Sequence, residues 1–260
     1  MTVNIRFDIY KNRVGVITLT RPEAANAMSI QLLTELSNTL KTLHYNRDIR
    51  VVLITGEGEK AFCAGADLKE RKGMDEHQVK QTVSLIGSTI QQVEDLPQPV
   101  IAVLNGVAFG GGLELALACD LRIAGKNAKI GLTETSLGII PGAGGTQRLP
   151  RLIGMGRAKE LIYTARRISA DEGYRLGIVE YVYEPEHLME KAYELALEIA
   201  KNAPLSLIQA KTAINHGMDA DLKTGLKIEA LAYNELLRTA DRLEGLQAFQ
   251  EKRKPQYIGK

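Results

Sequence analysis

One glutamate of this 260-residue chain, Glu114, lies directly behind a run of glycines in residues 105–120 (NGVAFGGGLELALACD). Glycines leave main-chain N–H groups open to close approach by a ligand. The residues after them are strong helix formers, and the first N–H groups of a helix lack internal partners and carry a partial positive charge. An anionic oxygen fits such a place, with the Glu114 carboxylate beside it. The segment is equally compatible with a simple tight turn followed by a favourable first-turn charge.

A second glycine-containing loop, residues 62–69 (FCAGADLK), also follows a predicted strand. It could offer a second backbone N–H to the same oxygen. Two converging N–H groups make an oxyanion hole, and losing one such donor typically costs about 3–4 kcal/mol of transition-state stabilisation. Asp67 in this loop has the residue type of a helix N-cap, and we expect that role for its side chain.

The second candidate acid, Glu134, lies in residues 130–149 (IGLTETSLGIIPGAGGTQRL), which are apolar and rich in glycine. A carboxylate in such surroundings is partly desolvated and hard to ionise. Two carboxylates that share one site titrate as a coupled pair and can hold one proton near neutral pH, which suits acid–base addition or removal of water. The sequence leaves open a structural alternative, an ion pair between Glu134 and an arginine such as Arg148.

Strand and helix patterns alternate in the first half of the chain, and these elements must position the loops. Short apolar runs closed by turn residues predict buried strands at residues 14–19, 51–55, 100–104 and 121–124. Apolar residues at helical spacing predict helices over residues 30–43 and 79–93, and Pro97 ends the second. This alternation predicts an α/β core whose sheet is covered on both faces.

The second half of the chain has mostly helical patterns. Apolar periodicity predicts helices near residues 186–201, 204–216 and 222–238. Ser169 and Asp241 each stand three residues before a glutamate, which is the arrangement of a helix capping box. Because Pro204 marks a break, we expect a core of residues 1–200 and a C-terminal helical region of residues 201–260.

Composition and charge argue against several classes of protein. Apolar residues make up 45% of the chain, charged residues 25% and the net charge is +2, as in a globular enzyme that binds an anionic ligand. With no Trp and 5% aromatic residues, a stacking surface for single-stranded nucleic acid has little support. The two cysteines form no CxxC motif and the four histidines are scattered, so we expect no metal site. No apolar run spans a membrane and no signal-peptide pattern is present, so we expect a cytoplasmic protein.

Four long motifs, in order along nearly the whole chain, resemble the crotonase superfamily of enoyl-CoA hydratases and isomerases. They are FCAGADLKER, NGVAFGGGLELALACD, ETSLGIIPGAGGTQRLPR and DRLEGLQAFQEKR. The resemblance implies an α/β fold, a spiral of repeated ββα units followed by a C-terminal helical trimerisation region, and a homo-oligomer that is a trimer or a dimer of trimers. It also implies an acyl-CoA thioester substrate, with coenzyme A as part of the substrate and no separate cofactor.

The same resemblance implies roles for individual residues. The backbone N–H groups of Ala66 and Gly111 would hold the thioester carbonyl oxygen. Glu114 and Glu134 would flank a water, the first mainly as its base and the second as donor of a proton to the α-carbon. Members that resemble isomerases typically keep only the second carboxylate, so the pair favours hydration. The residues implied to contact coenzyme A or the acyl group are Ala64, Asp67, Leu68, Lys69, Tyr233 and Lys252, the last two often from a neighbouring subunit.

Within the superfamily, the stretches CAGADLKER, GGLELALACD and AINHGMDADLKTGLKIE resemble the branch of 3-methylglutaconyl-CoA hydratases, which includes an AU-rich-RNA-binding homologue. We therefore predict an enoyl-CoA hydratase of fatty-acid or branched-chain amino-acid degradation, with a 3-methylglutaconyl-CoA hydratase of leucine degradation as the alternative. That substrate carries an extra carboxylate and needs a basic residue near the acyl end, which the sequence does not identify. A competing interpretation is RNA binding through residues 69–72 and Lys80, a basic face that neighbouring acidic residues dilute.

Overall fold

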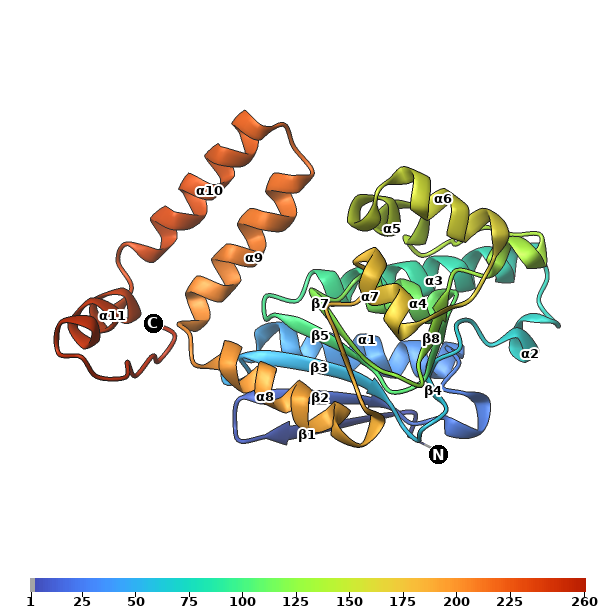
Figure 1. Ribbon diagram of the computed structural model, residues 1–260, viewed down its shortest axis with the longest axis horizontal. Helices are drawn as coiled ribbons and strands as arrows, with labels where there is room; N and C mark the ends of the chain where they lie inside the picture. Colours follow the sequence, from blue (N-terminus) through green and yellow to red (C-terminus); the bar gives the residue numbers. More distant parts are fainter. Residues whose placement is uncertain (1–2) are drawn as a thin grey trace.

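The computed structural model describes residues 3–260 and contains two β-sheets flanked by helices (Figure 1). The larger sheet has the spatial order β1 (Ile5–Tyr10), β2 (Val14–Leu19), β3 (Val51–Gly56), β5 (Val100–Leu104), β7 (Leu121–Gly125) and β10 (Tyr181–Tyr183). The smaller sheet has the order β4 (Ala61–Cys63), β6 (Val107–Phe109), β8 (Lys129–Gly131) and β9 (Ile168–Ser169). Only the β1–β2 and β8–β9 pairs are antiparallel among these strands.

Successive strands alternate between the two sheets, because β3, β5 and β7 belong to the larger sheet and the strand after each belongs to the smaller one. Helical segments follow each such pair, which makes a repeated ββα unit. The α-helices are α1 (Ile30–Tyr45), α2 (Leu68–Arg71), α3 (Glu76–Glu94), α4 (Gly111–Leu117), α5 (Gly145–Ile153), α6 (Met155–Thr164), α7 (Ala170–Leu176), α8 (Leu188–Ala200), α9 (Pro204–Met218), α10 (Leu222–Leu236) and α11 (Ala240–Gln250). Three short 3₁₀ helices are η1 (Pro22–Ala24), η2 (Glu134–Leu137) and η3 (Pro185–His187). The predicted α/β spiral of ββα units is confirmed.

The larger sheet is buried on both faces, as β3 illustrates. Side chains alternate between the faces of a strand. Val52 and Ile54 therefore pack in the main core with residues of α1, α3 and α4, whereas Val51 and Leu53 pack against α8. Figure 1 shows α8 along one face of the sheet and α1 on the other. The sequence prediction of a sheet covered on both faces is confirmed.

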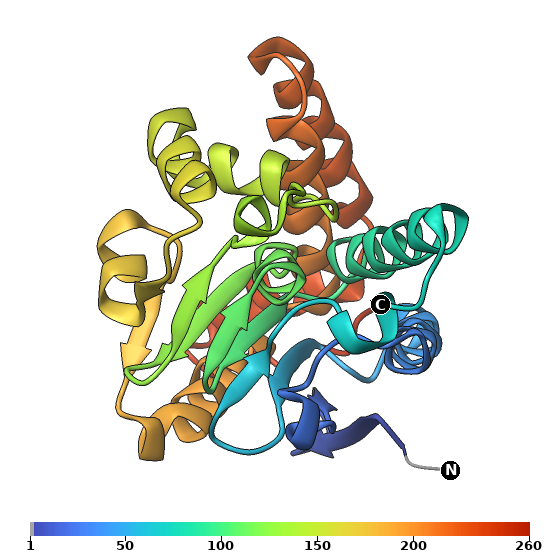
Figure 2. The same ribbon diagram turned by 90° about the vertical axis from the view of Figure 1, so that its right-hand side faces the viewer.

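Helices α9, α10 and α11 extend from the body that holds the sheets (Figures 1 and 2). Helices α9 and α10 lie against each other, and Lys211 of α9 reaches the core through an ion pair with Asp120, with Nζ 2.9 Å from Oδ2. Large apolar side chains stay exposed on these helices. They are Ile214, Met218, Leu222, Leu226, Leu231, Leu243, Leu246 and Phe249. Within residues 3–260, no helix is long and apolar enough to cross a membrane.

The two predicted capping boxes are wrong in detail. Ser169 does cap α7, since its side chain accepts from the Glu172 N–H, but the Glu172 side chain pairs with Arg166 instead of returning to the cap. Helix α11 is capped by Thr239, two residues before the predicted cap. Asp241 instead lies buried in the first turn, where it accepts the N–H groups of Ile258 and of the residue after it. The Glu172 carboxylate binds the charged Arg166 instead of the cap, and the Asp241 carboxylate binds backbone donors of the C-terminal segment.

Candidate active site

Glu114 and Glu134 line one cavity of about 480 Å³. Its walls come from four separate parts of the chain: the loop that leads into α2, the start of α4, the segment from η2 towards α5, and helix α3. The lining residues are mostly apolar. They are Ala64, Gly65, Ala66, Leu68, Arg71, Val83, Ile86, Gly110, Gly111, Glu114, Thr133, Glu134, Leu137, Ile139, Ile140, Gly142 and Ala143.

The two glycine-rich loops predicted from the sequence meet at this cavity. They follow β4 and β6, which are paired parallel strands, so both loops leave the same edge of the smaller sheet. Gly65 has φ +95°, and a Cβ there would lie 2.7 Å from the Phe109 carbonyl oxygen and 3.2 Å from the Gly111 nitrogen. Only glycine permits this conformation and this approach.

Two backbone N–H groups at this junction have no acceptor among residues 3–260, those of Ala66 and Gly111. Gly111 is the first residue of α4, where helical geometry leaves the N–H without an internal partner. Ala66 forms a parallel β-bridge with Met28. The hydrogen bonds of this bridge run from the Met28 N–H to the Gly65 carbonyl and from the Asp67 N–H to the Met28 carbonyl, so they do not use the Ala66 N–H. Both residues line the cavity, so both donors are available to a ligand.

Glu114 has its carboxylate held in place by two backbone N–H groups. It lies in the first turn of α4 and is 3% exposed. Its Oε1 accepts two backbone N–H groups, from Ala143 and Gly145, each at 2.8 Å. Burial raises the pKa of Glu114 above its ordinary value, although these two donors and the charge of Arg148 oppose the rise.

Glu134 has a different environment in the same cavity. It begins η2, is 8% exposed, and its Oε2 has no hydrogen-bond partner in the described chain. Burial raises the pKa of Glu134 to about 7, and the charge of Glu114 adds to the rise. A Cβ at Gly110, where φ is +51°, would lie 3.0 Å from Glu134 Oε1, so glycine there leaves room for the carboxylate. The pair has one acid fixed by donors and one that can hold a proton near neutral pH.

The structural alternative for Glu134 is wrong. Arg148 forms its ion pair with Glu94 of α3, and its Nε donates to Glu94 Oε2 at 2.9 Å. The same guanidinium donates to the carbonyl of Ala143 and thereby braces the segment that holds Glu114. Glu134 is left without a cationic partner because α3 supplies a nearer carboxylate to Arg148.

The structure separates the remaining predicted site residues into three groups. Ala64 and Leu68 line the cavity, and Lys69 is exposed beside them on α2. Asp67 caps α2 and pairs with Arg21, whose Nη2 lies 3.0 Å from Oδ2, so it has the capping role expected from its residue type. Tyr233 on α10 and Lys252 after α11 are exposed and lie outside the cavity wall of this chain.

Several residues of the site were not predicted from the sequence. The N–H groups of Ala143 and Gly145 hold Glu114, and the dense glycine of this segment was the available signal. Val83 and Ile86 come from a predicted helix, but periodicity does not tell which apolar side chains reach a cavity. Arg71 also lines the wall. It was visible only as one member of a short basic run.

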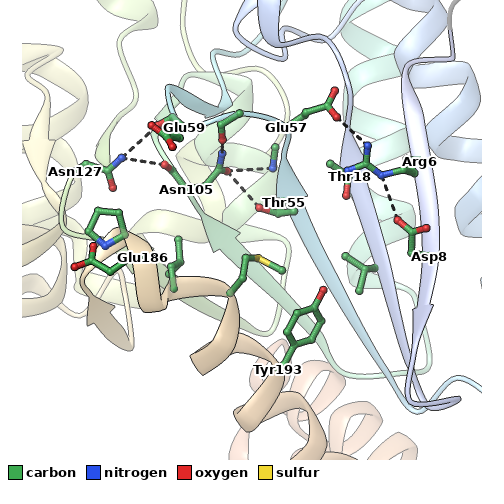
Figure 3. Close-up of a pocket in the computed structure, with 16 residues that line it drawn as sticks. Arg6, Asp8, Thr18, Thr55, Glu57, Glu59, Asn105, Asn127, Glu186 and Tyr193 are labelled. Carbon is green, nitrogen blue, oxygen red and sulfur yellow. Dashed lines mark hydrogen bonds and ion pairs between the residues drawn. The ribbon is translucent and has the colours of Figure 1, made fainter.

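A larger hollow, of about 680 Å³, lies between the larger sheet and α8 and shares no lining residue with the first (Figure 3). Several of its polar side chains bind one another or the backbone. Arg6 pairs with Asp8 and Glu57, and Asn105 Nδ2 donates to the carbonyls of Gly58, at 2.6 Å, and Ala61. The smaller cavity is the better candidate, because its functional groups have unused hydrogen-bonding capacity.

Comparison with known proteins identifies similar chains across the full length. Residues 10–260 match the family model described as enoyl-CoA hydratase/isomerase. The crystal structure of an enoyl-CoA hydratase from Bacillus anthracis is 58% identical, with a TM-score of 0.98, covering 99% of this chain and 100% of that one. A mitochondrial methylglutaconyl-CoA hydratase of Mus musculus is 48% identical over 95% of this chain and 80% of its own length. A short-chain-enoyl-CoA hydratase of Clostridium acetobutylicum is 45% identical over 94% of both chains.

Proposed function

The chain belongs to the enoyl-CoA hydratase/isomerase family, and we propose that it is an enoyl-CoA hydratase. It adds water reversibly across the 2,3-double bond of a trans-2-enoyl-CoA thioester to give the 3-hydroxyacyl-CoA. The observation that carries the proposal is the pairing of Glu114 and Glu134 in one cavity with two unpaired backbone donors. Family members named hydratase are similar to this chain over nearly its whole length.

The N–H groups of Ala66 and Gly111 are the proposed oxyanion hole. Hydrogen bonds from both to the thioester oxygen polarise the carbonyl, which makes C3 electrophilic. As water attacks C3, the electrons of the double bond move towards the thioester oxygen and an enolate develops. The two donors then bind a fuller negative charge than in bound substrate, and such a difference accelerates the reaction.

The two glutamates handle the protons of the added water. Glu114, fixed by Ala143 and Gly145, accepts a proton as the water oxygen bonds to C3. Glu134, whose pKa is raised to about 7, holds a proton near neutral pH and gives it to C2 of the enolate. One hydroxyl and one proton are thus added, and proton transfer from Glu114 to Glu134 restores the starting state.

Binding of the coenzyme A portion uses the loop before α2. The backbone at Ala64 would meet the adenine, Leu68 would pack on the ligand, and the exposed Lys69 would lie near its phosphates. No cofactor beyond this part of the substrate is needed, because the chemistry consists of proton transfers and oxyanion stabilisation. Asp67 contributes to this binding indirectly, because its side chain caps the N-terminus of α2.

The exposed apolar side chains of α9, α10 and α11 support a homo-oligomer, a trimer or a dimer of trimers, with residues 201–260 as the assembly region. In such an assembly Tyr233 and Lys252 would reach the acyl-CoA site of a neighbouring subunit. A cytoplasmic location and a place in fatty-acid or branched-chain amino-acid degradation complete the proposal. RNA binding is the weaker alternative, because Lys80, one cation of the predicted basic face, is paired with Glu76.

The test is the hydration of crotonyl-CoA by Glu114→Gln and Glu134→Gln variants. Each should lower kcat by about 10²–10⁴-fold, because each removes one proton-transfer step. Binding of butyryl-CoA, which lacks the double bond, should persist when measured by calorimetry. Glu186→Gln makes the same chemical change at an exposed position in the other hollow and should leave kcat unaltered. Near-normal turnover in both site variants would contradict the paired-carboxylate mechanism.

A further inference from the structure

Arg148 of α5 connects the end of α3 to the turn at residues 143–145. Its Nε donates to Glu94 Oε2 at 2.9 Å, and its Nη2 donates to the same oxygen and, at 2.8 Å, to Gln91 Oε1. Both acceptors lie in the last turn of α3. Its Nη1 donates to the Ala143 carbonyl at 3.1 Å. One guanidinium, in a side chain that is 16% exposed, therefore binds two segments that are far apart in the sequence.

The turn at residues 143–145 contacts both Arg148 and Glu114. The N–H of Ala143 donates to Glu114 Oε1, while the carbonyl of the same residue accepts from Arg148. Gly145 gives the second N–H to Glu114 Oε1, and a Cβ there would lie 3.0 Å from that oxygen. Gly144 has φ +107°, and a Cβ there would lie 2.0 Å from Arg148 Nη1. Glycine therefore stands where each charged group approaches the turn, and both groups are held against it.

The charges around the two glutamates differ in sign. Burial raises the pKa of Glu114, and the two N–H groups of the turn and the positive charge of Arg148 lower it again. Burial also raises the pKa of Glu134, to about 7, and the neighbouring charge of Glu114 adds to that rise. The surroundings therefore favour the ionised form at Glu114 and the protonated form at Glu134.

Other titratable side chains lie on the elements that surround Glu114. They are Glu94 of α3, Arg71 of α2, Glu134 of η2 and Cys63 of β4. Arg71 stays charged at every pH of an assay, and burial raises the pKa of the Cys63 thiol to about 12, so neither changes its charge near neutral pH. Glu94 acts through the guanidinium with which it is paired. Glu134 is coupled to Glu114 and titrates with it as a pair.

We propose that Arg148 is a positioning residue, which holds Glu114 through the turn at residues 143–145 and makes it the base of the pair. This inference rests on the proposed hydratase function and assigns which of two buried carboxyls takes the proton from water. A role in packing α3 on α5 would need only the ion pair with Glu94. The hydrogen bond to Ala143 is what joins the cation to the base.

The test is the pH dependence of kcat/KM for crotonyl-CoA, which reports the acid and the base of the free enzyme. On the acid side, kcat/KM should rise with pH as Glu114 ionises, and it should fall again near pH 7 as Glu134 loses its proton. Arg148→Met removes a positive charge that favours ionised Glu114, so the acid limb should move to higher pH by about 0.5–1 unit. The optimal kcat/KM should fall by about 10- to 100-fold, because the base is also displaced.

Two further variants separate the charge from the hydrogen bonds. Arg148→Lys keeps the charge without the fork that bridges Glu94 and Ala143, so the acid limb should stay close to its wild-type position while kcat falls by about 10-fold. Glu94→Gln removes a negative charge that offsets Arg148, so the acid limb should move to lower pH. Arg151→Met is the matched control, because it removes an exposed cation from the same helix. It should leave both limbs and kcat unchanged.

An acid limb that keeps its position in Arg148→Met, with the same loss of activity at every pH, would show a structural role alone and overturn the inference. An acid limb that does not move to lower pH in Glu94→Gln would do the same, and this variant carries the test if Arg148→Met does not fold. Either result in an enzyme that hydrates crotonyl-CoA would leave the proposed function intact. A wild type without hydratase activity would overturn the proposed function as well.

Discussion

Two hollows of the molecule, those of about 480 Å³ and 680 Å³, differ in the state of their polar groups more than in their size. In the larger one, between the larger sheet and α8, Asn105, Arg6 and their acidic neighbours bind one another or the backbone (Figure 3). In the smaller one, the Ala66 and Gly111 N–H groups and Glu134 Oε2 have no partner in the described chain. A buried polar group without a hydrogen-bond partner costs free energy. Such groups in one cavity therefore indicate a ligand that supplies the missing partners.

The volume of a hollow is therefore a poor guide to whether it is a functional site. Several polar residues of the larger hollow bind one another or the backbone and thereby stabilise the fold. The smaller one keeps donors and a protonatable acid in an unsatisfied state, which is useful only when a substrate arrives. Substitutions in the smaller cavity should therefore lower activity, and substitutions in the larger hollow should lower stability.

The largest effect is expected at Gly111. Proline at this position would delete the N–H while remaining acceptable as the first residue of a helix. Gly111→Ala is the control, because it adds a Cβ, which would meet Met28 Cε at 2.5 Å, but keeps the donor. Crotonyl-CoA hydration by Gly111→Pro should fall about 10²–10³-fold below that of Gly111→Ala. Equal activity of the two folded variants would show that this N–H is not used.

Asn105→Ala should have the opposite profile. It removes the amide that joins the ends of β3, β4 and β5 in the larger hollow, where Asn105 also accepts the Gly56 N–H at 3.1 Å. We expect a loss of about 2–3 kcal/mol in the free energy of unfolding, measured with urea, and unchanged kcat in the folded enzyme. A fall in kcat with intact stability would mean that the larger hollow takes part in the reaction.

Glu134→Gln should change the free energy of unfolding by an amount that depends on pH and vanishes in acid. The folded-state pKa of about 7 lies above the ordinary value of 4.5, so ionisation of Glu134 opposes folding. This penalty is absent below pH 4.5, grows between 4.5 and 7, and is complete above 7. The variant should therefore exceed the wild type by about 3 kcal/mol at pH 8 and equal it at pH 4. Denaturant unfolding at both values measures the difference, and a gap that is the same at both would refute the raised pKa.

The sequence predicted the framework of the site well because the signals are local. Glycines before Glu114 required a tight turn, and the residues after it a helix, so the position of Glu114 in the first turn of α4 followed. The alternation of strands and helices likewise predicted a sheet buried on both faces. Glu134 was expected to be desolvated because of the apolar residues around it, and its burial agrees.

Contacts between distant segments were the part that the sequence could not supply. The choice of Glu94 as partner of Arg148 depends on how α3 packs on α5, and periodicity does not give that register. Asp241 binds the C-terminal segment instead of capping α11, for the same reason. Arg71 looked like part of a solvated basic run, and only the folded chain places it on the cavity wall.

A crystal structure with bound butyryl-CoA would show whether the two N–H groups and the two glutamates meet at one thioester. We predict the thioester oxygen within hydrogen-bonding distance of the Ala66 and Gly111 nitrogens, and an ordered water between Glu114 and Glu134 near C3 of the acyl group. A thioester bound in the larger hollow, or one in the smaller cavity whose oxygen meets neither N–H group, would contradict the account.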